Sequence, residues 1–221
     1  QYLKSDGQGQ MTWSTPPAVT AACGFDALIQ LIEAYLSRQA SPLTDGLALQ
    51  GIAEGGRALA RLAEDATDRG ARRAMALASL LSGICLANAG LGAVHGLAAP
   101  LGALFPIPHG VACAAVLPQV MQANLAASRD TPAEERVWSR FARLSEALTG
   151  ERHADRTATV DLGLATLRQL QVKLEIPGLG RFGVTADRLG AIVAASREGS
   201  MKYNPVELSD GVLEDVLRQA L

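Results

Sequence analysis

The sequence predicts an all-α fold, a helical-bundle-like domain of about eight or nine helices, on the strength of three observations. Alanine and leucine, two strong helix formers, make up about a third of the 221 residues. Apolar residues recur three or four positions apart along most of the chain, the period of a helix that is buried on one face. The one stretch with a strand-like pattern is 171–176, and no internal repeat is present. These features argue against a β-sandwich or β-barrel.

Proline, glycine and capping residues divide the chain into nine expected helices. Pro42 suits the first turn of the second helix, and the Pro106-x-Pro108 pair separates the glycine-rich fourth helix from an apolar fifth. The last four helices are amphipathic and more charged, with cap signals at Thr185 and Ser209. The expected helices span 17–37, 42–66, 72–89, 92–104, 110–127, 132–148, 155–174, 185–197 and 209–221.

The domain organisation follows from the same pattern. Residues 1–14 include a polar, glycine-containing run and are expected to be a flexible lead-in, typical of a chain cut from something longer. Residues 15–221 are expected to form one helical domain, which is long enough to bury a sizeable core.

Composition excludes several function classes. The net charge is −2, and the 20 basic residues are scattered among 22 acidic ones, so we expect no nucleic-acid partner. The three cysteines, Cys23, Cys85 and Cys113, lie far apart without a C-x-x-C pair, which predicts a reduced protein with buried thiols. We find no uninterrupted apolar stretch of about 18 residues and no basic-then-apolar leader, so we expect a cytoplasmic protein without a membrane partner.

Two of the three histidines are candidates for chemistry. His153 lies in a charged run and is expected in a solvated loop, whereas His95 and His109 lie in the most apolar part of the chain. On one straight helix these two would be about 21 Å apart, too far to share a ligand. The Pro106-x-Pro108 turn prevents that path, so the imidazoles could converge. The alternative is that each histidine is a core residue bonded to the backbone.

Asp26 is the other candidate, because a carboxylate in an apolar helix seldom stays buried without a partner. Gln30 and Glu33 follow at i+4 and i+7, so the three line one helical face. One aspartate and two neutral imidazoles suit Zn²⁺ or Fe²⁺ and leave room for a substrate oxygen. The alternative is a polar stripe that faces solvent.

Taken in order, these motifs resemble iron-containing (group III) alcohol dehydrogenases. The resemblance extends over nearly the whole chain, from about Thr15 to Leu221. Its segments are Thr20–Leu28, Ser41–Asp45, Ala93–Ala103, Pro108–Gly110, Leu117–Met121 and Asn204-Pro205.

The resemblance implies the C-terminal helical half of a dehydroquinate synthase-like fold, with one divalent metal. The implied ligands are Asp26, His95 and His109, with Gln30 at the position where the family usually has a second ligand histidine. An amide oxygen ligates more weakly than an imidazole, so Gln30 is a weak ligand or an orienting residue. Ala99 also departs from the family pattern, because many members carry another histidine there.

The function that the resemblance implies is that of an NAD(P)-linked alcohol dehydrogenase or aldehyde reductase. Its substrate would be a small alcohol or aldehyde, its metal Fe²⁺ or Zn²⁺, and its assembly a homo-oligomer. The family binds NAD(P) in an N-terminal domain that this chain lacks, so residues 1–14 would be a remnant of it and the chain alone would be inactive. No catalytic residue beyond the metal ligands is assigned.

Two alternative functions remain open. In a non-catalytic helical scaffold, Gln30 and Ala99 would mark lost chemistry, and Asp26 would be neutral or bonded to the backbone. In a metal-free enzyme of the maleylacetate reductase type, the same fold would work without the ion. The three retained ligands count against this second alternative.

A glycine motif at Gly178–Gly183 matches G-x-G-x-x-G but is not interpreted as a nucleotide site. Too few residues follow it to build the paired βαβ units that such a site requires. We therefore expect no cofactor-binding residues in this chain apart from metal ligands.

Overall fold

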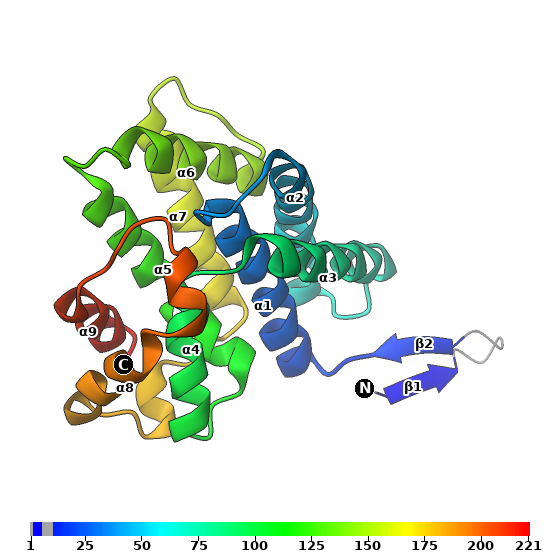
Figure 1. Cartoon of the computed structure of the whole chain (residues 1–221). Helices are drawn as coiled ribbons and strands as arrows, with labels where there is room; N and C mark the ends of the chain where they lie inside the picture. Colours follow the sequence, from blue (N-terminus) through cyan, green and yellow to red (C-terminus); the bar gives the residue numbers. More distant parts are fainter. Residues whose placement is uncertain (1, 6–10) are drawn as a thin grey trace.

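The computed structural model describes residues 2–5 and 11–221, and it is all-α apart from a short strand pair at the N-terminus (Figure 1). The described part contains the nine helices α1 Pro17–Leu36, α2 Pro42–Glu64, α3 Arg69–Ala89, α4 Ala93–Leu104, α5 His109–Ser128, α6 Glu134–Thr149, α7 Arg156–Lys173, α8 Leu189–Ser196 and α9 Asp210–Gln219. Three 3-10 turns, η1 Leu179–Phe182, η2 Ala186–Arg188 and η3 Gly199–Tyr203, join the later helices.

The predicted helices are confirmed, with ends that differ by at most three residues except at the eighth. There the chain begins as the 3-10 turn η2, and Thr185 makes no capping bond to it. At the other predicted cap, the Ser209 side chain accepts from the Val212 amide at 3.4 Å. Pro42 starts α2, and Ser41 and Thr44 form a reciprocal capping box there.

Two predictions about strands need correction. Residues 171–176 are not a strand, because α7 continues to Lys173 and the chain then turns at Glu175, whose φ is 53°. Instead, β1 Tyr2–Ser5 and β2 Met11–Ser14 pair antiparallel within the expected lead-in. Gln1 and residues 6–10 of that lead-in lie outside the described residues.

The glycine motif at Gly178–Gly183 forms the turn η1, which packs against the C-terminus. Leu179 N donates to Ala220 O at 2.8 Å, and Gly180 N donates to Leu221 O at 3.3 Å. Two amides that a phosphate cradle would offer are therefore used within the protein.

Helix α1 lies at the centre of the core, between α2 and α3 on one side and α5 on the other (Figure 1). Its residues Leu31–Leu36 are all buried. The crossing of α1 and α5 is close because Gly110 has no side chain: a Cβ there would overlap the carbonyl oxygen of Ala22. This contact sets how near the start of α5 lies to α1.

We expect Gly110→Ala to destabilise the protein by roughly 1–3 kcal/mol, because the added methyl must push α5 away from the α1 backbone. Gly83→Ala is the matched control, since it lies inside α3 with open space around its Cβ position, and it should stabilise by about 0.5–1 kcal/mol. Urea denaturation of both variants checks the pair. Equal effects would contradict the close contact.

Three helices, α1, α3 and α5, are long and apolar enough to cross a membrane by length and composition alone. The sequence analysis found no membrane-spanning candidate because it considered only uninterrupted apolar stretches, whereas these helices qualify by their mean hydropathy. Helices α1 and α5 use most of their apolar surface in the core, whereas α3 keeps Leu77, Leu80 and Ile84 exposed. The absence of a membrane partner stays a prediction.

Candidate metal centre

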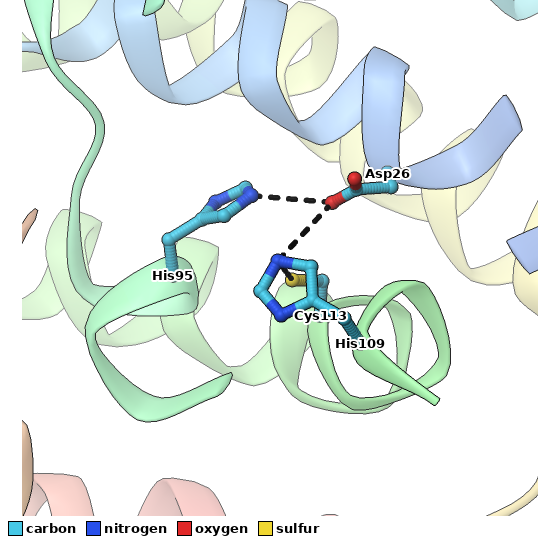
Figure 2. A group of neighbouring side chains, drawn as sticks. All are labelled: Asp26, His95, His109 and Cys113. Atoms are coloured by element: carbon cyan, nitrogen blue, oxygen red, sulfur yellow. Dashed lines mark hydrogen bonds and ion pairs between the residues drawn. The ribbon is translucent and has the colours of Figure 1, made fainter. Parts of the chain in front are cut away.

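Four potential ligand side chains from three helices converge beside α1 (Figure 2). They are Asp26 from α1, His95 from α4, and His109 and Cys113 from α5. One oxygen, nitrogen or sulfur atom from each lies within 4.8 Å of all the others. Asp26 Oδ1 is 3.2 Å from His95 Nε2 and 3.8 Å from His109 Nε2, and Cys113 Sγ is 3.6 Å from His109 Nε2.

The proline turn brings the two histidines together, which was one of the two arrangements that the sequence left open. Helix α4 ends at Leu104, Pro108 is the N-cap of α5, and His109 is the first residue of that helix. The imidazole centroids of His95 and His109 are 5.4 Å apart. The reversal between the two helices therefore replaces a helical separation of about 21 Å with direct contact.

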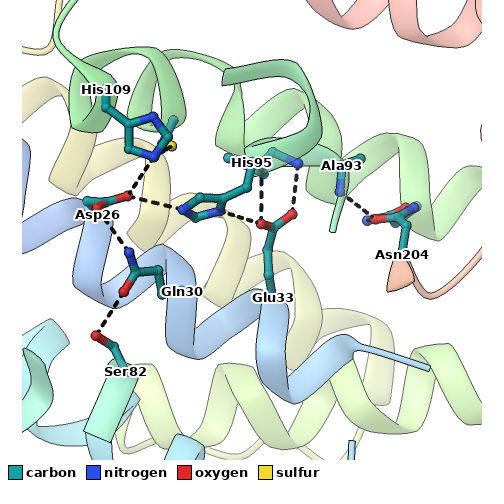
Figure 3. Close-up of polar contacts among 11 residues, drawn as sticks. Asp26, Gln30, Glu33, Ser82, Ala93, His95, His109 and Asn204 are labelled. Atoms are coloured by element: carbon teal, nitrogen blue, oxygen red, sulfur yellow. Dashed lines mark hydrogen bonds and ion pairs between the residues drawn. The ribbon is translucent and has the colours of Figure 1, made fainter. Parts of the chain in front are cut away.

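Glu33 fixes the orientation of His95 (Figure 3). Its Oε2 is 2.6 Å from His95 Nδ1, and it also accepts from the His95 amide at 3.3 Å. Its Oε1 accepts from the Val94 amide at 2.7 Å. The buried Glu33 carboxylate thus accepts from two backbone amides in the first turn of α4, which have no acceptor within the helix. It also holds the His95 ring so that Nε2 faces Asp26. The same second contact is typical of metal-bound histidines.

Asn204 completes the start of α4. Its Oδ1 accepts from the Ala93 amide at 3.0 Å (Figure 3). Its Nδ2 donates to Asn124 Oδ1 at 2.6 Å. Gly92 makes room for this arrangement, because a Cβ there would lie 2.8 Å from Glu33 Oε1 and 2.9 Å from Asn204 Oδ1. The backbone that carries His95 is therefore held from two sides.

Gln30 lies beside the cluster and holds Asp26. Its Nε2 donates to Asp26 Oδ2 at 3.1 Å, and its Oε1 accepts from Ser82 Oγ at 2.9 Å (Figure 3). Of the two roles considered for this residue, these contacts favour that of an orienting residue. Its role as a ligand stays a prediction.

The protonation of the site reflects burial and the two carboxylates. Burial alone would lower the pKa of His95, but hydrogen bonds to Asp26, Cys113 and Glu33 outweigh it and raise that pKa to about 12. Burial raises the pKa of the Cys113 thiol to about 11. Because metal ligands bind deprotonated, an ion that enters this site must release protons.

The donor set fits a divalent ion. Carboxylate oxygen and imidazole nitrogen are common ligands of zinc and iron, and the site is closed on one side and open on the other. The His95 side chain is 6% exposed, whereas the His109 side chain is 53% exposed. A small molecule can therefore approach from the side of His109.

The third histidine, His153, is exposed, as the sequence predicted. The expectation of buried thiols is wrong for Cys23, which is exposed near the start of α1, and holds for Cys85 and Cys113. Sequence reasoning missed Cys113 as a member of the cluster, although its i+4 spacing from His109 places both on one helix face.

The comparisons with known proteins agree with the motif pattern. A family model described as "Fe-containing alcohol dehydrogenase family, C-terminal" matches residues 20–221. The 1,3-propanediol dehydrogenase of Citrobacter freundii is 36% identical over 210 residues, which cover 93% of this chain and 51% of that protein. Long-chain-alcohol dehydrogenase 1 of Geobacillus thermodenitrificans is 48% identical over 112 residues, which cover 51% of this chain and 28% of that protein.

Solved structures show the same likeness in three dimensions. A 1,3-propanediol oxidoreductase superposes with a TM-score of 0.84 at 34% identity, over 94% of this chain and 53% of that chain. The maleylacetate reductase of Agrobacterium tumefaciens has a TM-score of 0.73 at 25% identity, over 93% of this chain and 53% of that chain. The chain spans about half the length of the curated propanediol dehydrogenases it matches.

Proposed function

Because this chain belongs to the Fe-containing alcohol dehydrogenase family, we propose that it is the metal- and substrate-binding part of an NAD(P)-linked alcohol dehydrogenase. Its substrates in this proposal are small alcohols and, in reverse, aldehydes. The convergence of Asp26, His95 and His109 from three separate helices carries the proposal. A scaffold without chemistry has no need to place a carboxylate against two imidazoles.

In the proposed site Asp26, His95 and His109 hold the metal, with Gln30 as a weak ligand or as the residue that orients Asp26. The chemistry that a divalent ion supplies at such a site is polarisation of an alcohol or carbonyl oxygen, which eases hydride exchange with a nicotinamide ring. Asp26 contributes negative charge, and Glu33 keeps Nε2 of His95 directed at the ion position. The exposed side of His109 leaves an entrance for a substrate.

The nicotinamide has no proposed site within this chain. We propose that NAD(P) is held by an N-terminal nucleotide-binding domain of the kind that the family carries, and that this chain alone does not turn over. A homo-oligomeric assembly is proposed on the same family grounds. A cytoplasmic location and the absence of a nucleic-acid partner are proposed from the composition and charge of the chain.

The test of this function is metal-dependent substrate binding. We expect 1,3-propanediol to bind the zinc-loaded chain in calorimetry, and to bind the chelator-treated chain at least about tenfold more weakly, a difference of 1.4 kcal/mol. The control compound is ethylene glycol dimethyl ether, a diether without a hydroxyl group, which should not show the metal-dependent gain. Equal diol binding with and without zinc would contradict the proposal and favour a metal-free reductase.

A further inference from the structure

We propose that Cys113 is a ligand of the metal, so that the centre is an Asp-His-His-Cys site, built from three side-chain types that bind zinc. The inference rests on the proposed metal centre and adds a residue that the family resemblance did not supply. It starts from the place of the Cys113 side chain in the cluster (Figure 2).

The position of Cys113 is the first argument. It follows His109 by one turn of α5 and is fully buried, with Sγ 3.6 Å from His109 Nε2. Its sulfur also lies within 4.8 Å of the ligand nitrogen of His95. The sulfur therefore lies beside both imidazoles, on the buried side of the cluster.

The separations are compatible with an ion held by four protein ligands, and a substrate oxygen would then be a fifth ligand that approaches from the exposed side of His109. Zinc–nitrogen and zinc–oxygen bonds of about 2.0–2.2 Å and a zinc–sulfur bond of about 2.3 Å place tetrahedral ligand atoms about 3.3–3.7 Å apart. Three separations in the cluster lie around that value: 3.2 Å from Asp26 Oδ1 to His95 Nε2, 3.8 Å from Asp26 Oδ1 to His109 Nε2, and 3.6 Å from Cys113 Sγ to His109 Nε2. Small side-chain movements would suffice to enclose an ion.

Gln30, the alternative fourth ligand, already forms hydrogen bonds through both polar atoms of its side chain. The oxygen of Gln30 accepts from Ser82, and its amide nitrogen, which cannot ligate, faces Asp26. To coordinate through its oxygen, Gln30 would have to break both contacts. Cys113 needs no such change, because its sulfur already lies at the imidazoles.

The other two cysteines, Cys85 and Cys23, have no histidine contact among the described residues. Cys85 is buried in α3, where its Sγ lies 3.6 Å from the Thr44 carbonyl oxygen. Cys23 is exposed on α1. Only Cys113 among the three cysteines has imidazole neighbours in the described contacts.

Coordination by Cys113 has a consequence for metal choice. The thiol loses its proton to solvent on binding, so the site presents a thiolate and a carboxylate to the ion. Soft thiolate favours zinc or cobalt over hard ions such as Mg²⁺ or Mn²⁺. We therefore expect the chain to select Zn²⁺ over Mn²⁺ more strongly than an Asp-His-His set does.

Cobalt substitution tests the ligand directly, because a thiolate bound to Co²⁺ gives a sulfur-to-metal charge-transfer band in the near ultraviolet. We expect the reduced, Co²⁺-loaded wild-type chain to show this band. Cys113→Ser should lose it while keeping the visible cobalt absorption, and its preference for Zn²⁺ over Mn²⁺ should fall at least about tenfold. Cys85→Ser is the matched control and should keep the band.

The outcomes separate this inference from the proposed function. A wild-type chain that binds one Co²⁺ without the charge-transfer band would overturn the role of Cys113 and leave the metal centre standing. A band that survives Cys113→Ser would overturn it as well. A wild-type chain that binds no Co²⁺ at all would overturn both proposals, and this result needs no variant to fold.

Discussion

Replacing either His95 or His109 with alanine is expected to abolish tight metal binding. Loss of a hydrogen bond to a metal ligand typically costs about 10–100-fold in metal affinity, so loss of the ligand itself should exceed about 100-fold. The two nitrogens lie 3.2 and 3.8 Å from the same Asp26 oxygen, so each variant removes one of the two imidazoles beside that carboxylate. Competition with a chromophoric chelator measures the affinity of each variant for Zn²⁺.

His153→Ala is the matched control for both variants. His153 is the remaining histidine of the chain, and it lies exposed in the loop before α7. The affinity of this variant should equal that of the wild-type chain. If all three alanine variants kept the same zinc affinity, the assignment of His95 and His109 would be wrong.

Removing the Glu33 carboxylate is expected to have the largest effect on stability. In Glu33→Ala the buried amides of Val94 and His95 and the His95 ring lose their acceptor. Breaking a buried pair of this kind costs roughly 3–5 kcal/mol in the free energy of unfolding. Urea denaturation in the presence of a chelator measures this loss without a contribution from bound metal.

Two further variants test whether the stability loss in Glu33→Ala comes from the lost acceptor oxygens. Glu33→Gln retains one acceptor oxygen and should lose less stability than Glu33→Ala. Glu54→Ala removes an exposed carboxylate from α2 and should change the free energy of unfolding by less than about 0.5 kcal/mol. A Glu33→Ala loss no larger than that of Glu54→Ala would contradict the role of Glu33 at the start of α4.

The helices could be predicted from the sequence because their signals are local. Pro42 and Ser41 set the start of α2, and the Pro106-x-Pro108 turn separates α4 from α5. The strand pair at the N-terminus could not be predicted, because residues 2–5 and 11–14 pair across a short polar run without a clear alternating pattern. The eighth helix was expected to begin at residue 185, but residues 186–188 form a 3-10 turn and α8 begins at Leu189. The ends of helices are the part of a fold that a sequence pattern locates least precisely.

The candidate site could be predicted in part. Asp26, His95 and His109 stood out because polar groups are rare in apolar helices, and the structure brings all three together. Glu33 was placed on the face of Asp26, but only the packing of α4 against α1 gives it the His95 ring as a partner. Asn204 is 111 residues from Ala93, the amide it caps, and no local pattern reveals such a contact.

The measurement that tests the account most directly is the metal content of the wild-type chain. The protein would be purified anaerobically, loaded with Fe²⁺ or Zn²⁺, dialysed and analysed by mass spectrometry. The account predicts close to one ion per chain with at least one of the two metals. A content near zero with both would contradict the metal centre and favour a metal-free reductase or a non-catalytic scaffold.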